Sequence, residues 1–387
     1  MTTWKKILLG SGVVFLAAVA ALAVAISRDE ACAPAADPPT GVETMRALQR
    51  RCYGDLEVLE LATVAKPVPG DDQVLVRVHA AAVNPLDLHY LTGKPYLMRL
   101  SSGLGAPKEP RLGVDYAGTV EEVGRNVTRF KPGDQVFGGR TGALADYVVV
   151  GENRAIAIKP VGTRFEQAAS VGIAGITALQ ALRDSAGVEA GDKVLVNGAS
   201  GGVGTFTVQI GKALGAEVTG VQSTRNLELV RSLGADHVID YTRENFTEGD
   251  ARYDVIVDNV GNHPLLALRR VLAPDGIVVA VSGPKDNPWI GPFWRILRAS
   301  ALSAFVSQDY NTLLSEFRQA DLETLAGMMA AGQVTPVIDR EYPLEQAVDA
   351  LAYLETGRAR GKVIVVVSPP EGDLPAEPVG TEESPAS

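Results

Sequence analysis

The sequence predicts an α/β protein in which a parallel sheet is wound on both faces by helices. An all-β module precedes this sheet, and one transmembrane helix precedes both. Between Lys193 and Gln222 a strand, a glycine cluster, a helix and a second strand follow one another. Short strands separated by turn residues come before this unit, and an uncharged run of 20 residues, Ile7 to Ile26, lies near the start of the chain.

The uncharged run is long enough to cross a bilayer, because 20 residues at 1.5 Å each span about 30 Å. It ends in the polar stretch Ser27 to Glu30. A cleaved signal peptide has a shorter apolar region, so the run favours a single-pass anchor over a signal peptide. Residues 1–40 are therefore expected to form an anchor and a linker containing Pro34, Pro38 and Pro39.

The composition limits the function classes. The net charge is −10, and five of the acidic residues lie in residues 369–387, a tail without bases that we expect to be disordered. The rest of the chain has no basic stripe, which argues against nucleic acid as a partner. Two cysteines, Cys32 and Cys52, are too few for a disulfide framework or a cysteine-rich zinc lobe.

An all-β module is expected over residues 41–165. Its strands are separated by turn stretches such as Pro69 to Asp71 and Lys131 to Asp134. The expected strands are Gln73 to Ala80, Gly118 to Gly124, Asp134 to Gly138, Leu144 to Val150 and Ala155 to Lys159. Helical spacing begins at Phe165 and continues to Ala186.

The glycine cluster marks a dinucleotide-binding unit of the Rossmann type. Its glycines, Gly198, Gly201, Gly202 and Gly204, join an apolar strand to a helix. Such glycines let the backbone approach a pyrophosphate, and the helix start offers unpaired N–H groups. Tight turns also use glycine for steric reasons alone, but the following strand at the expected distance favours nucleotide binding.

The end of the second strand favours NADPH over NADH. An acid that would bind the ribose hydroxyls of NADH is missing there, since the next one is Glu228. The strand is followed instead by Ser223, Thr224, Arg225 and Asn226, which suit a 2′-phosphate. The alternative is that Arg225 is a solvated residue at a helix start.

Several motifs occur in an order that resembles a known family. They are VNPLDLHYLTG, GVDYAGTVEEVGRNVTRFKPGDQVFG, GITALQAL, VLVNGASGGVG, VIDY, VDNVG and GKVIVVV. With these motifs in this order, residues 45–367 resemble the zinc-free, quinone oxidoreductase-like branch of the medium-chain dehydrogenase/reductase family. The resemblance implies a GroES-like catalytic domain over residues 41–165, a Rossmann cofactor domain over residues 166–303 and a return to the catalytic domain over residues 304–368.

The resemblance also implies the residues of the site. Asn84 would line the substrate cleft, with His89, where relatives often have a tyrosine, and Tyr90 beside it. Asn84 before a proline also suits a turn cap. The residues implied for cofactor binding are Thr177, Gly201, Gly202, Val203, Gly204, Ser223, Arg225, Asn226, Tyr241, Asn259 and Lys362. A homodimer is expected because an edge strand of the Rossmann sheet commonly pairs across a dimer in this family.

No metal site is expected. Zinc-dependent members of the family hold the metal with an early cysteine and a His-Glu pair. The corresponding stretches here are Ala81 and Ala82, and Gly113 to Asp115. A catalytic zinc needs three protein ligands and an open position, so we expect a zinc-free enzyme.

Without a metal, hydride delivery to a small apolar conjugated acceptor requires the fewest catalytic groups from the protein. In a quinone or an α,β-unsaturated carbonyl, the negative charge moves to an oxygen that hydrogen-bond donors can hold. The expected function is therefore NADPH-dependent reduction of quinones or activated alkenes. The alternatives are a zinc-free alcohol or carbonyl dehydrogenase, and a non-catalytic NADPH-binding membrane protein.

The side of the membrane on which the body lies stays open. Lys5 and Lys6 before the apolar run predict an N-terminus inside the cell and a body outside it. A soluble NADPH pool is expected inside. The stretch Pro288 to Val306, rich in apolar and aromatic residues, is expected to pack at the domain junction or line the cleft, and a second membrane contact is the alternative.

Overall fold

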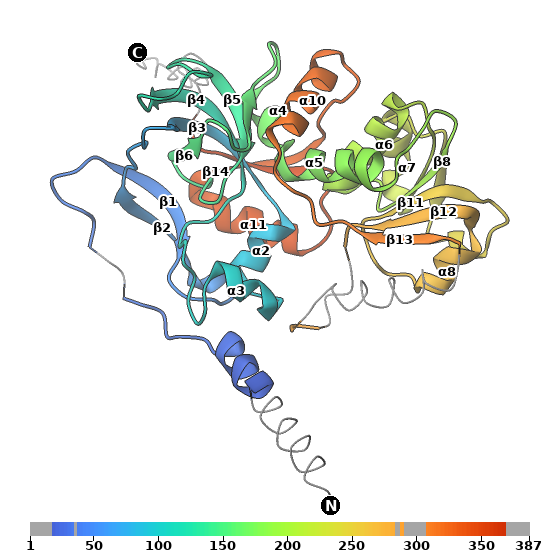
Figure 1. The fold of residues 1–387 in the computed structure, drawn as a ribbon, viewed down its shortest axis with the longest axis horizontal. Helices are drawn as coiled ribbons and strands as arrows, with labels where there is room; N and C mark the ends of the chain where they lie inside the picture. Colours follow the sequence, from blue (N-terminus) through green and yellow to red (C-terminus); the bar gives the residue numbers. More distant parts are fainter. Residues whose placement is uncertain (1–17, 35–36, 283–286, 290–306, 369–387) are drawn as a thin grey trace, which may run out of the picture.

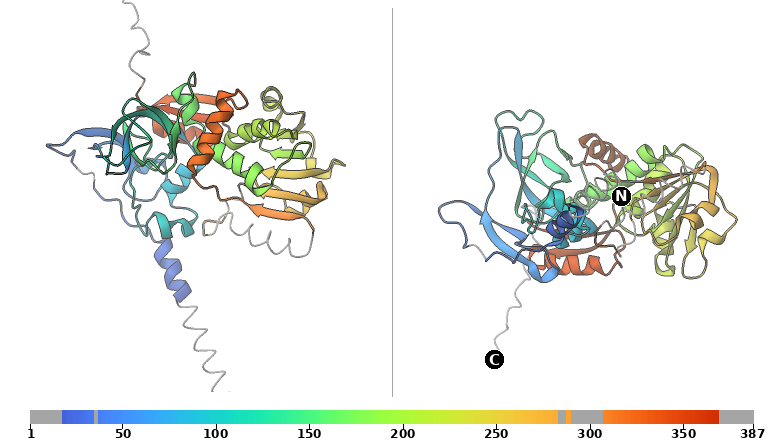
Figure 2. Two further views of the ribbon diagram at one scale, coloured as in Figure 1. Left: turned by 45° about the horizontal axis from the view of Figure 1, so that its top comes forward. Right: turned by 60° about the horizontal axis from the view of Figure 1, so that its bottom comes forward.

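The fold is taken from a computed structural model that describes residues 18–34, 37–282, 287–289 and 307–368. It has two lobes, a catalytic domain and a cofactor domain, which lie side by side in all views (Figures 1 and 2). Three expectations fall wholly or largely outside the described residues. They concern residues 7–17 of the anchor, residues 290–306 of the apolar stretch, and the tail at 369–387.

The cofactor domain contains a six-stranded sheet in the order β10-β9-β8-β11-β12-β13, in which every neighbouring pair is parallel. This is the strand order of a Rossmann fold, and the predicted parallel sheet is confirmed. The strands are β8 (Lys193–Asn197), β9 (Glu217–Gln222), β10 (His237–Asp240), β11 (Tyr253–Asp258), β12 (Leu272–Ala280) and β13 (Asp309–Thr312). The expected boundary at residue 304 falls before β13, so this sheet continues to Thr312.

Helices connect these strands as the sequence predicts. They are α6 (Gly202–Ala213), α7 (Leu227–Ser232) and α8 (Leu265–Arg270). The branched side chains of β8, Val194, Leu195 and Val196, are all fully buried. A parallel strand covered on both faces needs such a continuous apolar run, which is why the strand was recognisable in the sequence.

The catalytic domain is built on a seven-stranded sheet in the order β14-β15-β3-β4-β5-β7, with β6 paired to β3. Its strands are β3 (Gln73–Val83), β4 (Asp115–Val123), β5 (Gln135–Gly139), β6 (Tyr147–Gly151), β7 (Ile156–Ile158), β14 (Ile338–Pro343) and β15 (Lys362–Val366). A separate hairpin of β1 (Thr44–Arg50) and β2 (Leu59–Ala65) was not predicted. The helices of this lobe are α2 (Pro85–Thr92), α3 (Arg99–Ser102) and α11 (Ala347–Glu355).

Three helices join the lobes, α4 (Phe165–Ala169), α5 (Gly172–Gln180) and α10 (Gln319–Ala330). The stretch of helical spacing from Phe165 to Ala186 contains α4 and α5, and a π-helical turn follows α5. One hydrophobic core contains Ile364 of the catalytic sheet, Ile176 of α5 and Val196 of the cofactor sheet. The two lobes thus share a core, which fixes the site between them.

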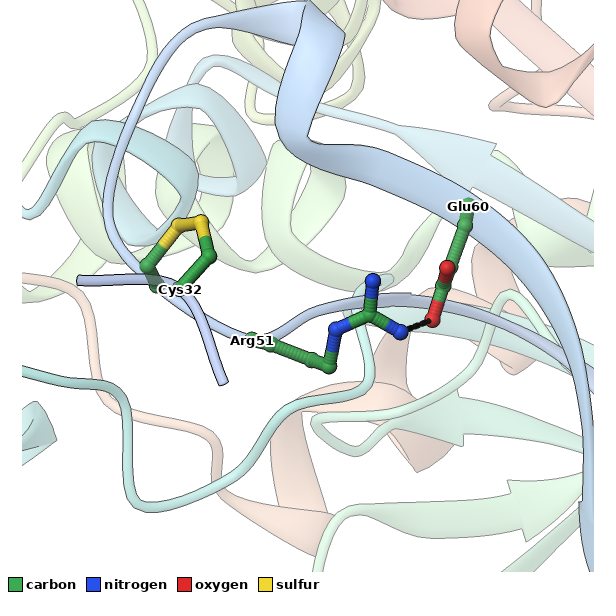
Figure 3. The surroundings of a disulfide bond; sticks show 4 residues. Cys32, Arg51 and Glu60 are labelled. Carbon is green, nitrogen blue, oxygen red and sulfur yellow. Dashed lines mark hydrogen bonds and ion pairs between the residues drawn. A yellow bond between two sulfur atoms is a disulfide. The ribbon is translucent and has the colours of Figure 1, made fainter. Parts of the chain in front are cut away.

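Residues 18–27 form a helix whose first residues project away from the catalytic lobe (Figure 1). Its Val19, Leu22 and Val24 side chains are exposed. Among the described residues, no helix is both long and apolar enough to cross a membrane. The linker after it carries Cys32, which forms a disulfide with Cys52 beside the Arg51 to Glu60 ion pair (Figure 3). The sequence analysis did not predict this bond.

Candidate cofactor and substrate site

The glycine loop joins β8 to α6 in a turn that requires glycine at two positions, Gly198 and Gly204. Gly198 has a φ of +80°, a conformation that other residues rarely adopt. A Cβ on Gly204 would lie 2.1 Å from the carbonyl oxygen of Gly198. Gly201, Gly202 and Val203 are half-buried where α6 begins. The loop therefore presents the N-terminus of α6, with its unpaired N–H groups, to a ligand.

A pocket lies where β9 ends. It is lined by Ser223, Thr224, Arg225 and Tyr241, together with Gly357 and Arg358 from the segment after α11. The Arg225 Nη2 atom donates to the carbonyl oxygen of Arg358 at 3.3 Å, so the two arginines lie close together. Two guanidinium groups, a phenol and hydroxyls suit a phosphate dianion.

The carboxylate nearest this pocket is already engaged. Asp240, at the end of β10, accepts hydrogen bonds from Thr224 Oγ1 and from the backbone and side chain of Thr242. The hydrogen bond from Thr224 holds the pKa of Asp240 below its usual value. Both oxygens of Asp240 are therefore already bonded to neighbouring threonines, and no carboxylate lines the pocket.

Asn226 is turned toward the glycine loop. Its Nδ2 atom donates to Ser200 Oγ at 2.9 Å, and the residue is buried. The structure thus brings Ser223, Arg225 and Tyr241 together in one pocket and places Asn226 beside that pocket, in contact with the loop.

Several buried polar atoms around the glycine loop have no hydrogen-bond partner among the described residues. They are both amide atoms of Gln222, both of Asn259, and Oδ1 of Asn226. Gln222 ends β9 and Asn259 follows β11, and these strands lie on either side of β8. An unsatisfied buried polar group costs about 1–3 kcal/mol. Because ligands of open α/β sheets bind at these strand ends, the residues present fit a dinucleotide.

Lys362 links the two lobes at the glycine loop. It opens β15, and its Cδ would lie 3.3 Å from a Cβ on Gly202. Its Nζ atom donates to Asn84 Oδ1 and lies 3.4 Å from Asp115 Oδ2. All three side chains are buried. An ammonium group beside the start of α6 favours the negative charge of a bound pyrophosphate.

Asn84 is fully engaged in this cluster. Its Nδ2 atom donates to Asp115 Oδ2 at 3.0 Å and to the carbonyl oxygen of Ala82 at 3.1 Å. Asn84 also begins α2, in a reciprocal capping arrangement with Asp87. Burial raises the pKa of Asp87 to about 7, and burial also raises the pKa of Asp115. The positive charge of Lys362 acts in the opposite direction on both pKa values. Both amide hydrogens are therefore used within the protein, and the predicted donation by Asn84 to a substrate requires one of these bonds to open.

The other predicted residues lie on nearby elements. His89 is half-buried on α2, with Nδ1 2.7 Å from the carbonyl oxygen of Lys94. Tyr90 packs against the core of the catalytic domain, and burial raises its pKa. Thr177, on α5, donates through Oγ1 to Ser315 Oγ at 3.0 Å. The sequence analysis missed Arg358 and Gln222, although basic residues directly before the Lys362 strand were a usable signal for the first.

No group of three or more His, Cys, Asp or Glu side chains in the described part of the chain is placed to hold a metal ion. Asp115, in the stretch where the resemblance to zinc-dependent members would imply a ligand, accepts from the Ile173 amide through Oδ1 and from Asn84 through Oδ2. Each of its two oxygens thus already accepts a hydrogen bond within the protein.

The parallel sheet, the glycine loop and the pocket after β9 define a dinucleotide-dependent oxidoreductase. Comparisons with known proteins refine this class. The alcohol dehydrogenase GroES-like domain family matches residues 70–160, which confirms the predicted GroES-like domain, and the zinc-binding dehydrogenase family matches residues 233–365.

Two curated relatives are 34% identical to this chain. They are the 2-methylene-furan-3-one reductase of Solanum lycopersicum, aligned over 86% of this chain and 82% of its own length, and the quinone oxidoreductase of Homo sapiens, over 85% and 99%. The solved structure of the quinone oxidoreductase from Coxiella burnetii is 30% identical, with a TM-score of 0.74 over 84% of this chain and 100% of that one. The chain therefore belongs to the medium-chain dehydrogenase/reductase family, in the quinone oxidoreductase-like branch, among its NAD(P)H-dependent oxidoreductases.

Proposed function

We propose that this protein uses NADPH to reduce a small apolar quinone or α,β-unsaturated carbonyl compound, without zinc. The pocket after β9 carries the cofactor part of the proposal, because Arg225 and Arg358 meet there and no carboxylate lines it. The substrate part is supported by relatives named for a quinone and for an unsaturated furanone.

The residues of the site have separable roles in this proposal. When bound, the nicotinamide supplies a hydride. The glycine loop and Lys362 would hold the pyrophosphate, Thr177 would orient the nicotinamide ribose, and Asn259 would lie near the adenosine or the nicotinamide. The cluster of Lys362, Asn84 and Asp115 joins the start of α2 to the glycine loop, so a substrate bound beside α2 would lie next to the cofactor. In a conjugated acceptor the developing charge moves to an oxygen that a donor on α2 can hold, and water supplies the proton.

Zinc-free action is supported by the contacts of Asp115. Its carboxylate is bound by a backbone amide, by Asn84 and by Lys362. A nearby ammonium group opposes the approach of a divalent cation, because like charges repel strongly in a buried site. Full activity in the presence of a strong chelator, with no zinc detected by elemental analysis, is the expected result.

The test of the activity uses the full chain in detergent micelles. It is mixed with NADPH and, separately, with a quinone, an enone and an aldehyde, and the loss of NADPH absorbance is followed. We expect loss with the quinone and the enone. Loss with the aldehyde alone would overturn the proposal in favour of a carbonyl dehydrogenase, and no loss with any of the three would favour the non-catalytic alternative.

We also propose that the N-terminal segment anchors the enzyme in a membrane. The described helix at residues 18–27 is apolar and exposes Val19, Leu22 and Val24, which lipid would cover. The protein should therefore remain in the membrane pellet after carbonate washing. A homodimer through the edge strand β13 is proposed as well, and light scattering in detergent should give twice the mass of the chain.

A further inference from the structure

Arg99 fastens the end of the N-terminal helix to the catalytic domain. The residue is only 1% exposed, and its Nη1 atom donates to the carbonyl oxygens of Ile26 at 3.3 Å and Arg28 at 3.5 Å. The same atom forms an ion pair with Asp29 at 2.8 Å. A cation at the C-terminus of a helix also interacts favourably with the helix dipole. Ile26, the last residue of the apolar run, is buried.

The guanidinium group is itself held in place from the catalytic side. It lies over the rings of Tyr53 and Tyr96, 4.2 Å and 4.7 Å from their centroids. It also donates to the carbonyl oxygens of Gly93 and Thr92, the residues that end α2. The helix that leads toward the expected anchor is thus bonded to the end of the helix that carries the predicted substrate residues.

Two further contacts hold the linker to the same surface. The Glu30 amide donates to the carbonyl oxygen of Gly105 at 3.0 Å, and a Cβ on Gly105 would lie 2.7 Å from the Glu30 side chain. Two residues later, Cys32 is bonded to Cys52 (Figure 3). The helix therefore leaves the catalytic domain at a fixed position.

Large apolar side chains are exposed around this position. Leu97, Leu100 and Leu104 are 38%, 51% and 53% exposed, and Trp289 is 40% exposed. Leu97 and Trp289 are neighbours, because the Leu97 amide donates to the carbonyl oxygen of Trp289 at 3.3 Å, and the Trp289 ring lies edge-on to Tyr96 at 5.1 Å. Leu100 lies on α3 and Leu104 follows it, a few residues along the chain from Leu97. Clustered exposed apolar side chains indicate a surface that another phase or molecule covers.

We propose that Leu97, Leu100, Leu104 and Trp289 form a membrane-contact face that rests on the boundary between lipid headgroups and acyl chains. The inference depends on the proposed anchor. The apolar run ends at Ile26, and Arg99 holds that residue, so the edge of the hydrocarbon lies level with Arg99 and its leucine neighbours. Tryptophan, the residue type of Trp289, is suited to this boundary.

This placement has a consequence for the substrate. The face adjoins the end of α2, to which Arg99 is bonded. A quinone or enone dissolved in the bilayer would then reach the cleft beside α2 without crossing water. The proposed substrate class is accordingly one that partitions into lipid.

Fluorescence quenching tests the face directly. The full chain, with Trp4→Phe and Trp294→Phe, keeps Trp289 as its single tryptophan and is placed in lipid nanodiscs. We expect strong quenching of Trp289 by lipids brominated near the headgroup end of their acyl chains. Unquenched Trp289 in a chain that stays in the nanodisc would overturn the face while leaving the anchor intact, and loss of the chain from the nanodisc would instead refute the anchor.

A second test uses substrate supply. The triple variant Leu97→Glu, Leu100→Glu and Leu104→Glu should stay membrane-bound through the anchor. Its KM should rise about tenfold or more for a long-chain quinone in the bilayer, because apolar contact with lipid is lost. Its KM for a short water-soluble quinone should be unchanged.

The matched control places glutamates at apolar residues that are exposed elsewhere, Val68, Val161 and Leu266. In this variant the KM should be unchanged for both the long-chain and the short quinone. Equal KM increases for the two quinones in the triple leucine variant would refute the membrane-contact face. Conversion of a dimer to a monomer by Leu100→Glu would also refute it, because a second copy of the chain would then cover these residues.

Discussion

Replacing Arg225 with Asp should reverse the cofactor preference. Arg225 is exposed beside Arg358, so the charge-assisted hydrogen bond it would give a 2′-phosphate is worth about 1.5 kcal/mol, the low end of the usual range. Repulsion between the new carboxylate and the phosphate dianion adds about 1–2 kcal/mol in a water-like medium. The sum of about 3 kcal/mol corresponds to a roughly hundredfold higher KM for NADPH.

NADH should be affected in the opposite direction, because an Asp at this position can accept hydrogen bonds from the two ribose hydroxyls. Steady-state kinetics with each cofactor and a saturating quinone measure the change. The matched control is Arg231→Asp, which makes the same charge change on the exposed face of α7, where Arg231 pairs with Glu228. An Arg225→Asp variant with the cofactor preference of the control would show that the pocket does not bind the 2′-phosphate.

Three further predictions concern the loop, a buried acid and the linker. Gly204→Ala should abolish NADPH binding measured by cofactor fluorescence, because its Cβ would lie 2.1 Å from a carbonyl oxygen, whereas Gly201→Ala, with its nearest neighbour at 3.5 Å, should bind. Asp87 has a folded pKa raised to about 7, so it binds a proton more readily folded than unfolded. Its contribution should lower the free energy of unfolding as pH rises from about 4 to about 7, by up to about 4 kcal/mol, and then level off. Urea unfolding of Asp87→Asn should lack this fall, and a parallel fall would contradict the assignment. Removing the disulfide with Cys32→Ser and Cys52→Ser should cost about 3 kcal/mol in the same assay, given the 20-residue separation. An unchanged midpoint would show that the bond adds no stability.

The cofactor lobe was predictable because its signals are local. The apolar run of β8 and the glycines that follow it are adjacent in sequence, and each requires its own conformation. The β1 and β2 hairpin was missed because TMRALQR has no regular alternation of apolar and polar residues. Burial of its Met45, Ala47 and Leu48 follows from contacts with the rest of the lobe.

The details of the site depended on residues that are distant in sequence. Arg358 is 133 residues from Arg225, and no local pattern brings the two together. The contacts of Asn84 arise in the same way, since Asp115 and Lys362 are 31 and 278 residues away. The sequence could therefore identify Asn84 as a candidate site residue, whereas only the fold shows that both of its amide hydrogens are already donated.

The disulfide and the cofactor pocket favour different sides of the membrane. A bond between Cys32 and Cys52 persists best in an oxidising compartment, and for an anchored chain Lys5 and Lys6 also predict a body outside the cytoplasm. The arginine pocket favours NADPH, which is expected inside. The contact between the linker and the catalytic domain does not depend on the side of the membrane. Arg99 binds Ile26 through a hydrogen bond and Asp29 through an ion pair, and neither interaction is sensitive to oxidation or reduction. If the chain is anchored as proposed, the Arg99 contacts, rather than the disulfide, would therefore hold the end of α2 at the proposed membrane face in either compartment.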